Sequence, residues 1–316
     1  MKNKTLFVVA AAIGAILCVS CGPKEGVIGK KHKIDLIMAV DSHYQDERLL
    51  MTTDTYIEQK WNWDGKEMYR IDYHGGEHPY SEVFFYDGRK IIRTTVPAYS
   101  IRSEFFYDGR KLERIEVYDK DELYCNMAFI HDGKQLTGIS CNYYTVSDTN
   151  NAILEKMANP LRSLVGDEVA MCLNSENCQR IARQKARSSK SSVNVRYEIA
   201  WNDDNPTQIV CSDAEGQRTI RLQYDSKENP FYQLYGFHEL NDPIFGFAML
   251  SKNNVLAIRM PYKRNNNQLF KYRYEYDGDV VAKRWLSYSY PSVDYTTLDS
   301  VTYKFEKAEE FSYIED

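Results

Sequence analysis

One short phrase recurs along this chain and constrains what it can fold into. An aromatic run is followed by Asp-Gly and then by a basic residue, at positions 61–66, 84–89, 105–110 and 129–134. Asp-Gly between two strand-like runs is a strong hairpin signal, because Gly accepts the positive φ of a tight turn and Asp tolerates it. The phrase therefore predicts a series of antiparallel β-hairpins.

The spacing of the turns extends this prediction to most of the chain. Asp64, Asp87, Asp108 and Asp132 are separated by 23, 21 and 24 residues, which suits one hairpin of two strands and two connections. Further turn sequences follow at 203–206, 225–229 and 276–279. We expect a mainly all-β fold, an extended antiparallel hairpin meander that forms a curved sheet or a barrel.

Alternating residues indicate which face of this sheet is buried. Val193, Val195 and Tyr197 share one face, whereas Asn194 and Arg196 point the other way. Charged residues on a membrane-spanning face cost about 2–4 kcal/mol each at mid-membrane. The mixture of charges and tyrosines in these strands favours a domain in water.

Residues 151–190 interrupt the hairpin pattern. Residues 152–158 and 161–173 are expected to be helical, and Ser175 is a suitable N-cap for a further helix through residue 187. We expect this insertion to cover apolar surface or to plug an open barrel end. The rest of 34–316 is predicted to be a single hairpin-repeat domain.

The first twenty residues resemble a lipoprotein signal peptide. Lys2 and Lys4 precede an apolar stretch, and Cys21 follows Ser20 as in the lipobox, where this Cys is acylated and becomes the new N-terminus. Residues 21–33 then form a tether, so the predicted partner is a membrane, reached through the lipid anchor. The location expected is the outer membrane, with the periplasmic face and the cell surface both open.

Charge and composition limit the other partners. The formal net charge is −5, and it becomes about −7 once Lys2 and Lys4 leave with the signal peptide, which argues against nucleic acid as a partner. Aromatic residues make up 13% of the chain, including 25 tyrosines, so a substantial core can form.

The repeated phrase, the lipobox and the segments 201–209 and 224–232 together resemble a family of uncharacterised Bacteroidetes lipoproteins. The resemblance implies a porin-like all-β fold and carries no catalytic residues. The Tyr-Asp-Gly phrases also look like YD-type repeats, a likeness that shared hairpin physics explains.

No motif in the sequence indicates a reaction or a cofactor. The pair His74 and His78 lies in a Gly-rich turn, and Asp203 and Asp204 precede Pro206 as ordinary turn residues, so no metal site is predicted. No nucleophile elbow, phosphate loop or dinucleotide fingerprint is present. We therefore predict no catalytic residues and no cofactor.

Two sets of residues remain as candidates. Trp61, Trp63, Trp201 and Trp285 are the candidates for ligand stacking, and the ligands expected are a glycan, whose sugar rings stack on aromatic side chains, or a small apolar molecule. If Asp132-Gly133-Lys134 is a three-residue loop, Cys125 lies opposite Cys141, which makes these residues a candidate disulfide in an oxidising envelope. The same three-residue loop at 108–110 places Glu104 opposite Arg114.

The interpretation that follows is a lipid-anchored envelope protein that acts as a non-enzymatic binding or structural module. One alternative is a carrier that encloses a lipid or another small apolar ligand, and a second is a glycan-processing enzyme. A Tyr-lined cavity would favour the carrier, and a polar cleft with two convergent carboxylates would favour the enzyme.

Overall fold

The computed structural model describes most of the chain after its leader. The described residues are 33–65, 67–75, 79–88, 90–144, 152–172, 192–232, 250–262, 266–293 and 300–314. The chain separates into two compact units, Met1–Lys31 and His32–Asp316, and every described residue belongs to the second. The predicted signal peptide and Cys21 lie outside the described residues.

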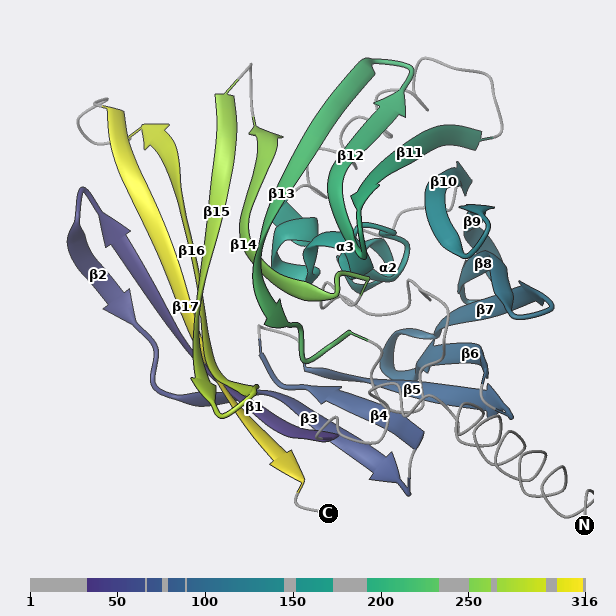
Figure 1. Cartoon of the computed structure of the whole chain (residues 1–316), viewed down its shortest axis with the longest axis horizontal. Helices are drawn as coiled ribbons and strands as arrows, with labels where there is room; N and C mark the ends of the chain where they lie inside the picture. The colour runs from purple at the N-terminus through teal and green to yellow at the C-terminus, as the bar shows by residue number, and fades with distance from the viewer. Residues whose placement is uncertain are drawn as a thin grey trace, which may run out of the picture. The chain divides into compact units, whose positions relative to one another are not determined.

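Strands make up most of this second unit (Figure 1). The strands of the first half are β1 (Lys33–Gln45), β2 (Arg48–Thr52), β3 (Tyr56–Asp64), β4 (Glu67–Tyr73), β5 (Tyr80–Asp87), β6 (Lys90–Val96), β7 (Ile101–Asp108), β8 (Lys111–Asp119), β9 (Glu122–Asp132) and β10 (Gln135–Tyr144). Those of the second half are β11 (Ser192–Asn202), β12 (Asn205–Asp213), β13 (Gly216–Glu228), β14 (Asn253–Tyr262), β15 (Asn266–Asp277), β16 (Val280–Val293) and β17 (Ser300–Ile314). A short 3-10 turn, η1 (Pro97–Tyr99), joins β6 to β7.

The sheet closes on itself. Each strand from β3 to β17 pairs antiparallel with the next, and β17 pairs with β1 along almost its whole length. The other edge of β1 pairs with β3 over Leu36–Ala39 and with β2 over Ser42–Gln45. In the described part of the chain, sixteen strands form the ring, and β2 extends it as a hairpin on β1. The all-β prediction is confirmed, and the sheet is a closed barrel.

The hairpin turns are tighter than the sequence predicts. Asp108 pairs with Lys111, so the loop holds only Gly109 and Arg110, and Gly109 has φ +58°. A bulge two residues further on shifts the register, which places Glu104 opposite Glu116 and Phe106 opposite Arg114. The predicted three-residue loop, with Glu104 opposite Arg114, is therefore wrong. The same turn and bulge recur in the hairpins β3–β4, β5–β6, β11–β12 and β15–β16.

The bulge explains the aromatic pair in the repeated phrase. Phe106 lies on the outer face under the Arg114 guanidinium, 3.8 Å from the ring centroid. Tyr107 points inward, and its hydroxyl donates to the carbonyl of Ile91 at 2.8 Å. Ile91 lies at the bulge of the preceding hairpin, where the ladder of backbone hydrogen bonds is interrupted. Equivalent bonds join Tyr86 to Met68, Trp201 to Leu136, Tyr224 to Pro206, Tyr274 to Val255 and Tyr313 to Val281.

A helical insertion lies inside the ring. Helices α2 (Ala152–Met157) and α3 (Arg162–Val165) are followed by helical residues 167–172, and Gly166 with φ +85° separates the last two segments (Figure 1). Leu154, Leu161 and Leu164 are buried in one continuous core with the inward side chains of the strands. The Tyr143 hydroxyl of β10 donates to the carbonyl of Ala158 at 3.1 Å. The segment predicted as a further helix, 175–187, lies outside the described residues.

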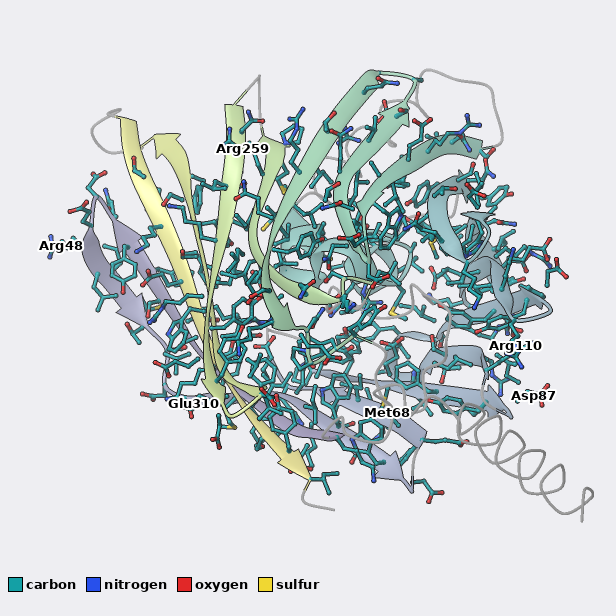
Figure 2. All side chains as sticks on the ribbon, viewed as in Figure 1. Arg48, Met68, Asp87, Arg110, Arg259 and Glu310 are labelled. Carbon is teal, nitrogen blue, oxygen red and sulfur yellow. The ribbon has the colours of Figure 1, made fainter. Side chains whose placement is uncertain are left out.

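The outer face of the barrel is polar. Ion pairs between neighbouring strands or along one strand lie there, among them Lys60–Asp35, Arg102–Glu104, Arg114–Glu116, Lys283–Glu310 and Lys304–Glu306. Figure 2 shows Glu310, Arg48 and Arg110 projecting away from the centre of the ring. Among the helices of the described residues, none is both long enough and apolar enough to cross a membrane.

Candidate functional site: a cavity in the barrel lumen

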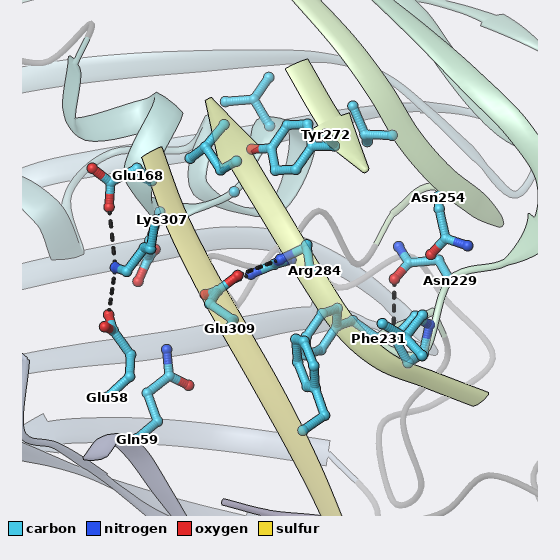
Figure 3. A pocket seen from close by; sticks show the side chains of 18 of the residues that line it. Glu58, Gln59, Glu168, Asn229, Phe231, Asn254, Tyr272, Arg284, Lys307 and Glu309 are labelled. Carbon is cyan, nitrogen blue, oxygen red and sulfur yellow. Dashed lines mark hydrogen bonds and ion pairs between the residues drawn. The ribbon is translucent and has the colours of Figure 1, made fainter. Parts of the chain in front are cut away.

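The lumen contains a cavity of about 390 Å³ beside the helical insertion. Residues of β3, β4, β14, β15, β16 and β17 form one part of its wall, and Lys156, residues 165–172 and residues 229–231 contribute the rest. Figure 3 shows charged side chains of β3, β16 and β17 converging on this space. The cavity lies between segments that are far apart in the sequence, from Glu58 to Phe311, because β1 pairs with β3 on one edge and with β17 on the other.

Lys307 lies at the centre of one charged group in the wall. Strand alternation points Lys307 inward with Phe305 and Phe311. Its Nζ lies 2.9 Å from Glu58 Oε1 on β3 and 3.4 Å from Glu168 Oε2 on the helical insertion (Figure 3). Burial lowers the pKa of Lys307, but Glu168 and Glu58 outweigh it, so the pKa lies well above its ordinary value.

Arg284 and Glu309 form a second pair, across β16 and β17. Arg284 Nε and Nη2 donate to the two carboxylate oxygens of Glu309 at 2.6 and 3.0 Å, a bidentate geometry. Phe231 and Phe311 flank the guanidinium, each with its ring centroid 5.5 Å away. Burial raises the pKa of Glu309, but the adjacent Arg284 holds it below its ordinary value. Arg284 is therefore fully committed to a neighbouring carboxylate.

A third charged group fixes the helical insertion to the wall. Asp167 accepts from Arg162 Nε at 2.7 Å and pairs with Lys156 Nζ at 2.7 Å. Lys156 also lies 4.4 Å from the centre of the Tyr73 ring on β4, and Arg162 lies 3.9 Å from Glu82 on β5. Burial raises the pKa of Asp167, but Arg162 and Lys156 together hold it below its ordinary value.

Part of the cavity wall is aromatic and aliphatic. Tyr272 and Tyr274 of β15 stack with ring centroids 6.4 Å apart, and Leu286 and Val281 of β16 line the cavity with them. The Tyr274 hydroxyl donates to the carbonyl of Val255, whereas the Tyr272 hydroxyl has no hydrogen-bond partner among the described residues. The cavity is thus amphipathic, and its rings adjoin its paired charges, since Arg284 lies 6.0 Å from the centre of the Tyr272 ring.

The amide groups at the cavity edge are mostly occupied by local bonds. Asn229 Oδ1 accepts from the backbone N–H of Phe231 at 3.0 Å, and its Nδ2 donates to Ser251. Asn254 Nδ2 lies 2.9 Å from the Tyr276 hydroxyl. These bonds hold Phe231 against the lumen, so the amides act mainly as supports for the aromatic wall.

The four tryptophans proposed for stacking do not line this cavity. Trp61 is buried, with only 1% exposed, and donates to Gln59 Oε1; Trp63 donates to the carbonyl of Ile34. Trp201 donates to the carbonyl of Leu136, and Trp285 lies on the outer face with Arg273 3.8 Å above its ring. A role for any of them in binding stays a prediction.

Cys125 and Cys141 are both buried, and neither forms a disulfide in the structure. Cys125 lies opposite Tyr143, and Cys141 lies opposite Met127, because the turn is tight and a bulge near Leu136 shifts the register. The predicted face-to-face register is therefore wrong. The two residues remain diagonal neighbours on one face, and a disulfide between them stays a prediction without support from the register.

The remaining sequence candidates lie apart from the cavity. His74 follows β4, where its backbone N–H donates to Glu58, while His78 lies outside the described residues. Asp204 pairs with Lys252 at the surface. Over the described ranges, no three or more His, Cys, Asp or Glu side chains come together as metal ligands.

Sequence reasoning missed the charged residues of the lumen. On β17, Lys307 and Glu309 alternate onto the same face as the buried Phe305 and Phe311. Two charged residues on an otherwise apolar face were the signal that the sequence offered. Arg284 gave no such signal. The bulge between Val281 and Lys283 changes which residues of β16 point inward, so alternation counted from Val281 places Arg284 on the outer face.

Comparisons with known proteins add little to this description. No family model matches the chain, and no curated protein matches it. Among solved structures, the chain is similar to a porin-like protein from Bacteroides uniformis ATCC 8492, with 8% sequence identity and a TM-score of 0.44 over 88% of this chain and 97% of that one. The closed barrel is established by the strand pairing itself.

Proposed function

We propose that this chain is a non-enzymatic binding protein of the bacterial envelope, which holds a small ligand in the lumen of a plugged barrel. The observation that carries the proposal is the cavity of about 390 Å³, which falls within the size range of small-molecule sites. Its tyrosines match the feature expected of a carrier, and its charges extend the ligand class beyond purely apolar molecules.

The outer face supports a barrel that stands in water. Charged pairs such as Arg102–Glu104 and Arg114–Glu116 would each cost several kcal/mol against lipid. The lipobox at Cys21, followed by a tether, is consistent with attachment of such a barrel to the outer membrane, as in the lipoprotein family that the sequence resembles. Metabolic labelling with an alkynyl fatty acid should mark the wild type and not Cys21→Ala.

The glycan-processing alternative is less well supported. Glu58 and Glu168 converge, but both bind the same Lys307 ammonium. A glycosidase needs one carboxylic acid and one free carboxylate on either side of the bond that breaks. A shared lysine leaves neither group free for that task.

Binding in the lumen can be tested with a neutral dye, N-phenyl-1-naphthylamine, whose fluorescence rises in an apolar site. Leu286→Trp should abolish saturable binding, because Leu286 is 3% exposed and lines the cavity. Ser287→Trp, one residue along β16 and on the opposite face, is the matched control and should bind normally. Equal binding by both variants, or no saturable binding by the wild type, would contradict the proposal.

A further inference from the structure

We propose that the lumen cavity takes a small organic cation, an ammonium group on an aromatic or aliphatic body, and that Glu168 receives the ammonium. This inference rests on the proposed binding function and names the chemical class of its ligand. It follows from how the charges of the wall pair with one another.

The charges that line the cavity do not balance. Among the described residues that line the cavity there is one carboxylate more than there are cations. The carboxylates are Glu58, Asp167, Glu168 and Glu309, and the cations are Lys156, Arg284 and Lys307. Glu309 is fully paired with Arg284, and Asp167 is paired with Lys156 and with Arg162 behind it. The carboxylate without a cation of its own is therefore one of the two that share Lys307.

Glu58 and Glu168 differ in how many bonds they make and in how exposed they are. Glu58 lies nearer to Lys307, at 2.9 Å, and its other oxygen accepts from the Tyr56 hydroxyl at 3.0 Å. Glu168 lies 3.4 Å from Lys307 and makes no other bond to a described residue. Its side chain is 36% exposed, against 17% for Glu58, and it lines the cavity. Glu168 is therefore the carboxylate with capacity for another partner.

The electrostatics around Glu168 agree with this assignment. Burial raises the pKa of Glu168, and Lys307 offsets only part of the shift because Glu58 and Asp41 add repulsion. A cation that enters the cavity would supply the missing charge. An anion would instead have to displace Glu309 from Arg284 or the two carboxylates from Lys307.

The apolar part of the cavity wall suits the body of such a ligand. Tyr272 and Tyr274 present stacked rings to the cavity, Leu286 of β16 lies beside them, and Met171 of the helical insertion also lines the cavity, so an apolar or aromatic group can pack there. Aromatic faces also attract cations. The Tyr272 hydroxyl, which has no hydrogen-bond partner among the described residues, supplies one polar contact on that side.

Three matched probes test the class: 2-phenylethylamine, 2-phenylethanol and phenylacetate, titrated into the full-length protein by calorimetry at pH 7.5. The amine should bind at least about ten-fold more tightly than the alcohol or the acid, a difference of about 1.4 kcal/mol. Equal or tighter binding of the acid or the alcohol would overturn the cation inference while leaving the binding function intact. Absence of binding by all three would overturn it as well, and the dye titration then decides the function separately.

Glu168→Gln tests the residue. It should weaken binding of the amine at least about ten-fold and leave the alcohol unchanged, whereas Glu198→Gln, an exposed position on β11, should change neither. Unchanged amine binding in Glu168→Gln would overturn the assignment.

If the Gln variant fails to fold, the wild type still gives an answer. Amine affinity should fall between pH 7.5 and pH 5 as Glu168 takes up a proton. The other ionisable groups that interact with it are Lys307, Glu58, Asp41, Cys172, Tyr272 and Tyr288. A flat pH profile would contradict the inference.

Discussion

At the scale of single residues, the lumen is unusual in placing lysine and arginine where a barrel core is usually apolar. Arg284 and Lys307 point inward from β16 and β17, and each is held by carboxylates on neighbouring elements. Buried pairs of this kind contribute little net stability, but breaking one is costly because it leaves an uncompensated charge. Net stability is therefore a weak reason for their presence in the lumen.

Arg284→Met should destabilise the protein by about 3–5 kcal/mol, because it leaves Glu309 buried without its bidentate partner. The double variant Arg284→Met with Glu309→Leu should recover much of the loss, since no charge then remains. Denaturant unfolding of both variants measures this. A double variant less stable than Arg284→Met alone would contradict the explanation.

Glu168→Gln should raise the melting temperature of the unliganded protein at pH 8. The pKa of Glu168 is raised in the folded state above its ordinary 4.5, so the folded state binds more protons and the free energy of unfolding falls as pH rises between those two pKa values. Gln does not ionise, so the free energy of unfolding of the variant does not fall in this way. Its advantage over the wild type should shrink as the pH is lowered toward 4.5, and an advantage that grows on acidification would show the sign to be wrong.

At the scale of the element, the Asp-Gly hairpin is a module of four cooperating features. The turn uses a glycine at positive φ, the bulge follows, an outward aromatic ring lies under an arginine, and an inward Tyr or Trp bonds the bulged carbonyl of the hairpin before it. Each hairpin thus helps to complete its predecessor. This dependence gives the repeated phrase a structural reason beyond turn propensity.

Tyr107→Phe should cost about 1–3 kcal/mol, because the carbonyl of Ile91 loses its donor in a partly buried place. Tyr69→Phe is the matched control, since Tyr69 is 40% exposed and sits as the extra residue of a bulge. It should stay within about 0.5 kcal/mol of wild type. Similar losses for the two variants would indicate that the bond to Ile91 does not matter.

Gly109→Val should also cost about 1–3 kcal/mol, through backbone strain alone. The φ of Gly109 is +58°, and a Cβ built there meets nothing within 4 Å, so steric collision contributes nothing. Gly109→Asn should cost less, because Asn tolerates the left-handed region. Thermal melts of the two variants compare them directly. An equal melting temperature for both would mean that backbone strain at positive φ is not the cause of the destabilisation.

The sequence was sufficient to predict the hairpins but not their register. Asp108-Gly109 identifies a turn because the requirement for positive φ is local. The bulge at Glu113 leaves no sign in the turn sequence, so pairing based on loop length alone was displaced by two residues. The charged residues of the lumen were harder still, because Glu58, Glu168 and Lys307 meet only through closure of the ring.

At the scale of the whole unit, the barrel is closed by the strands that are furthest apart in the chain. Lys33 of β1 pairs with Ile314 of β17, so the two ends of the described domain lie side by side. All other neighbouring strands in the ring are consecutive, apart from the crossing from β1 to β3. The seam β1–β17 is therefore the single long-range pairing on which the enclosed lumen depends.

A circular permutant should fold. Joining residue 314 to residue 33 by a short Gly-Ser linker and opening the β8–β9 turn between Lys120 and Asp121 keeps every strand pair, and the opened turn is a surface hairpin tip. The far-ultraviolet circular dichroism should match that of the parent. As a contrast, a chain ending at residue 299 lacks β17, exposes two strand edges and should aggregate in size-exclusion chromatography. A monomeric truncated chain that retains dye binding would contradict the role of the seam.

The same seam sets an order in time. As the chain is made, the strand that emerges first, β1, has to wait for the last strand before its second edge is covered, and residues 46–299 lie in between. Long-range pairing of this kind is slow and leaves an open edge that invites wrong partners. Under the envelope location proposed above, secretion of this protein should therefore depend on periplasmic chaperones that shield β1 until β17 arrives.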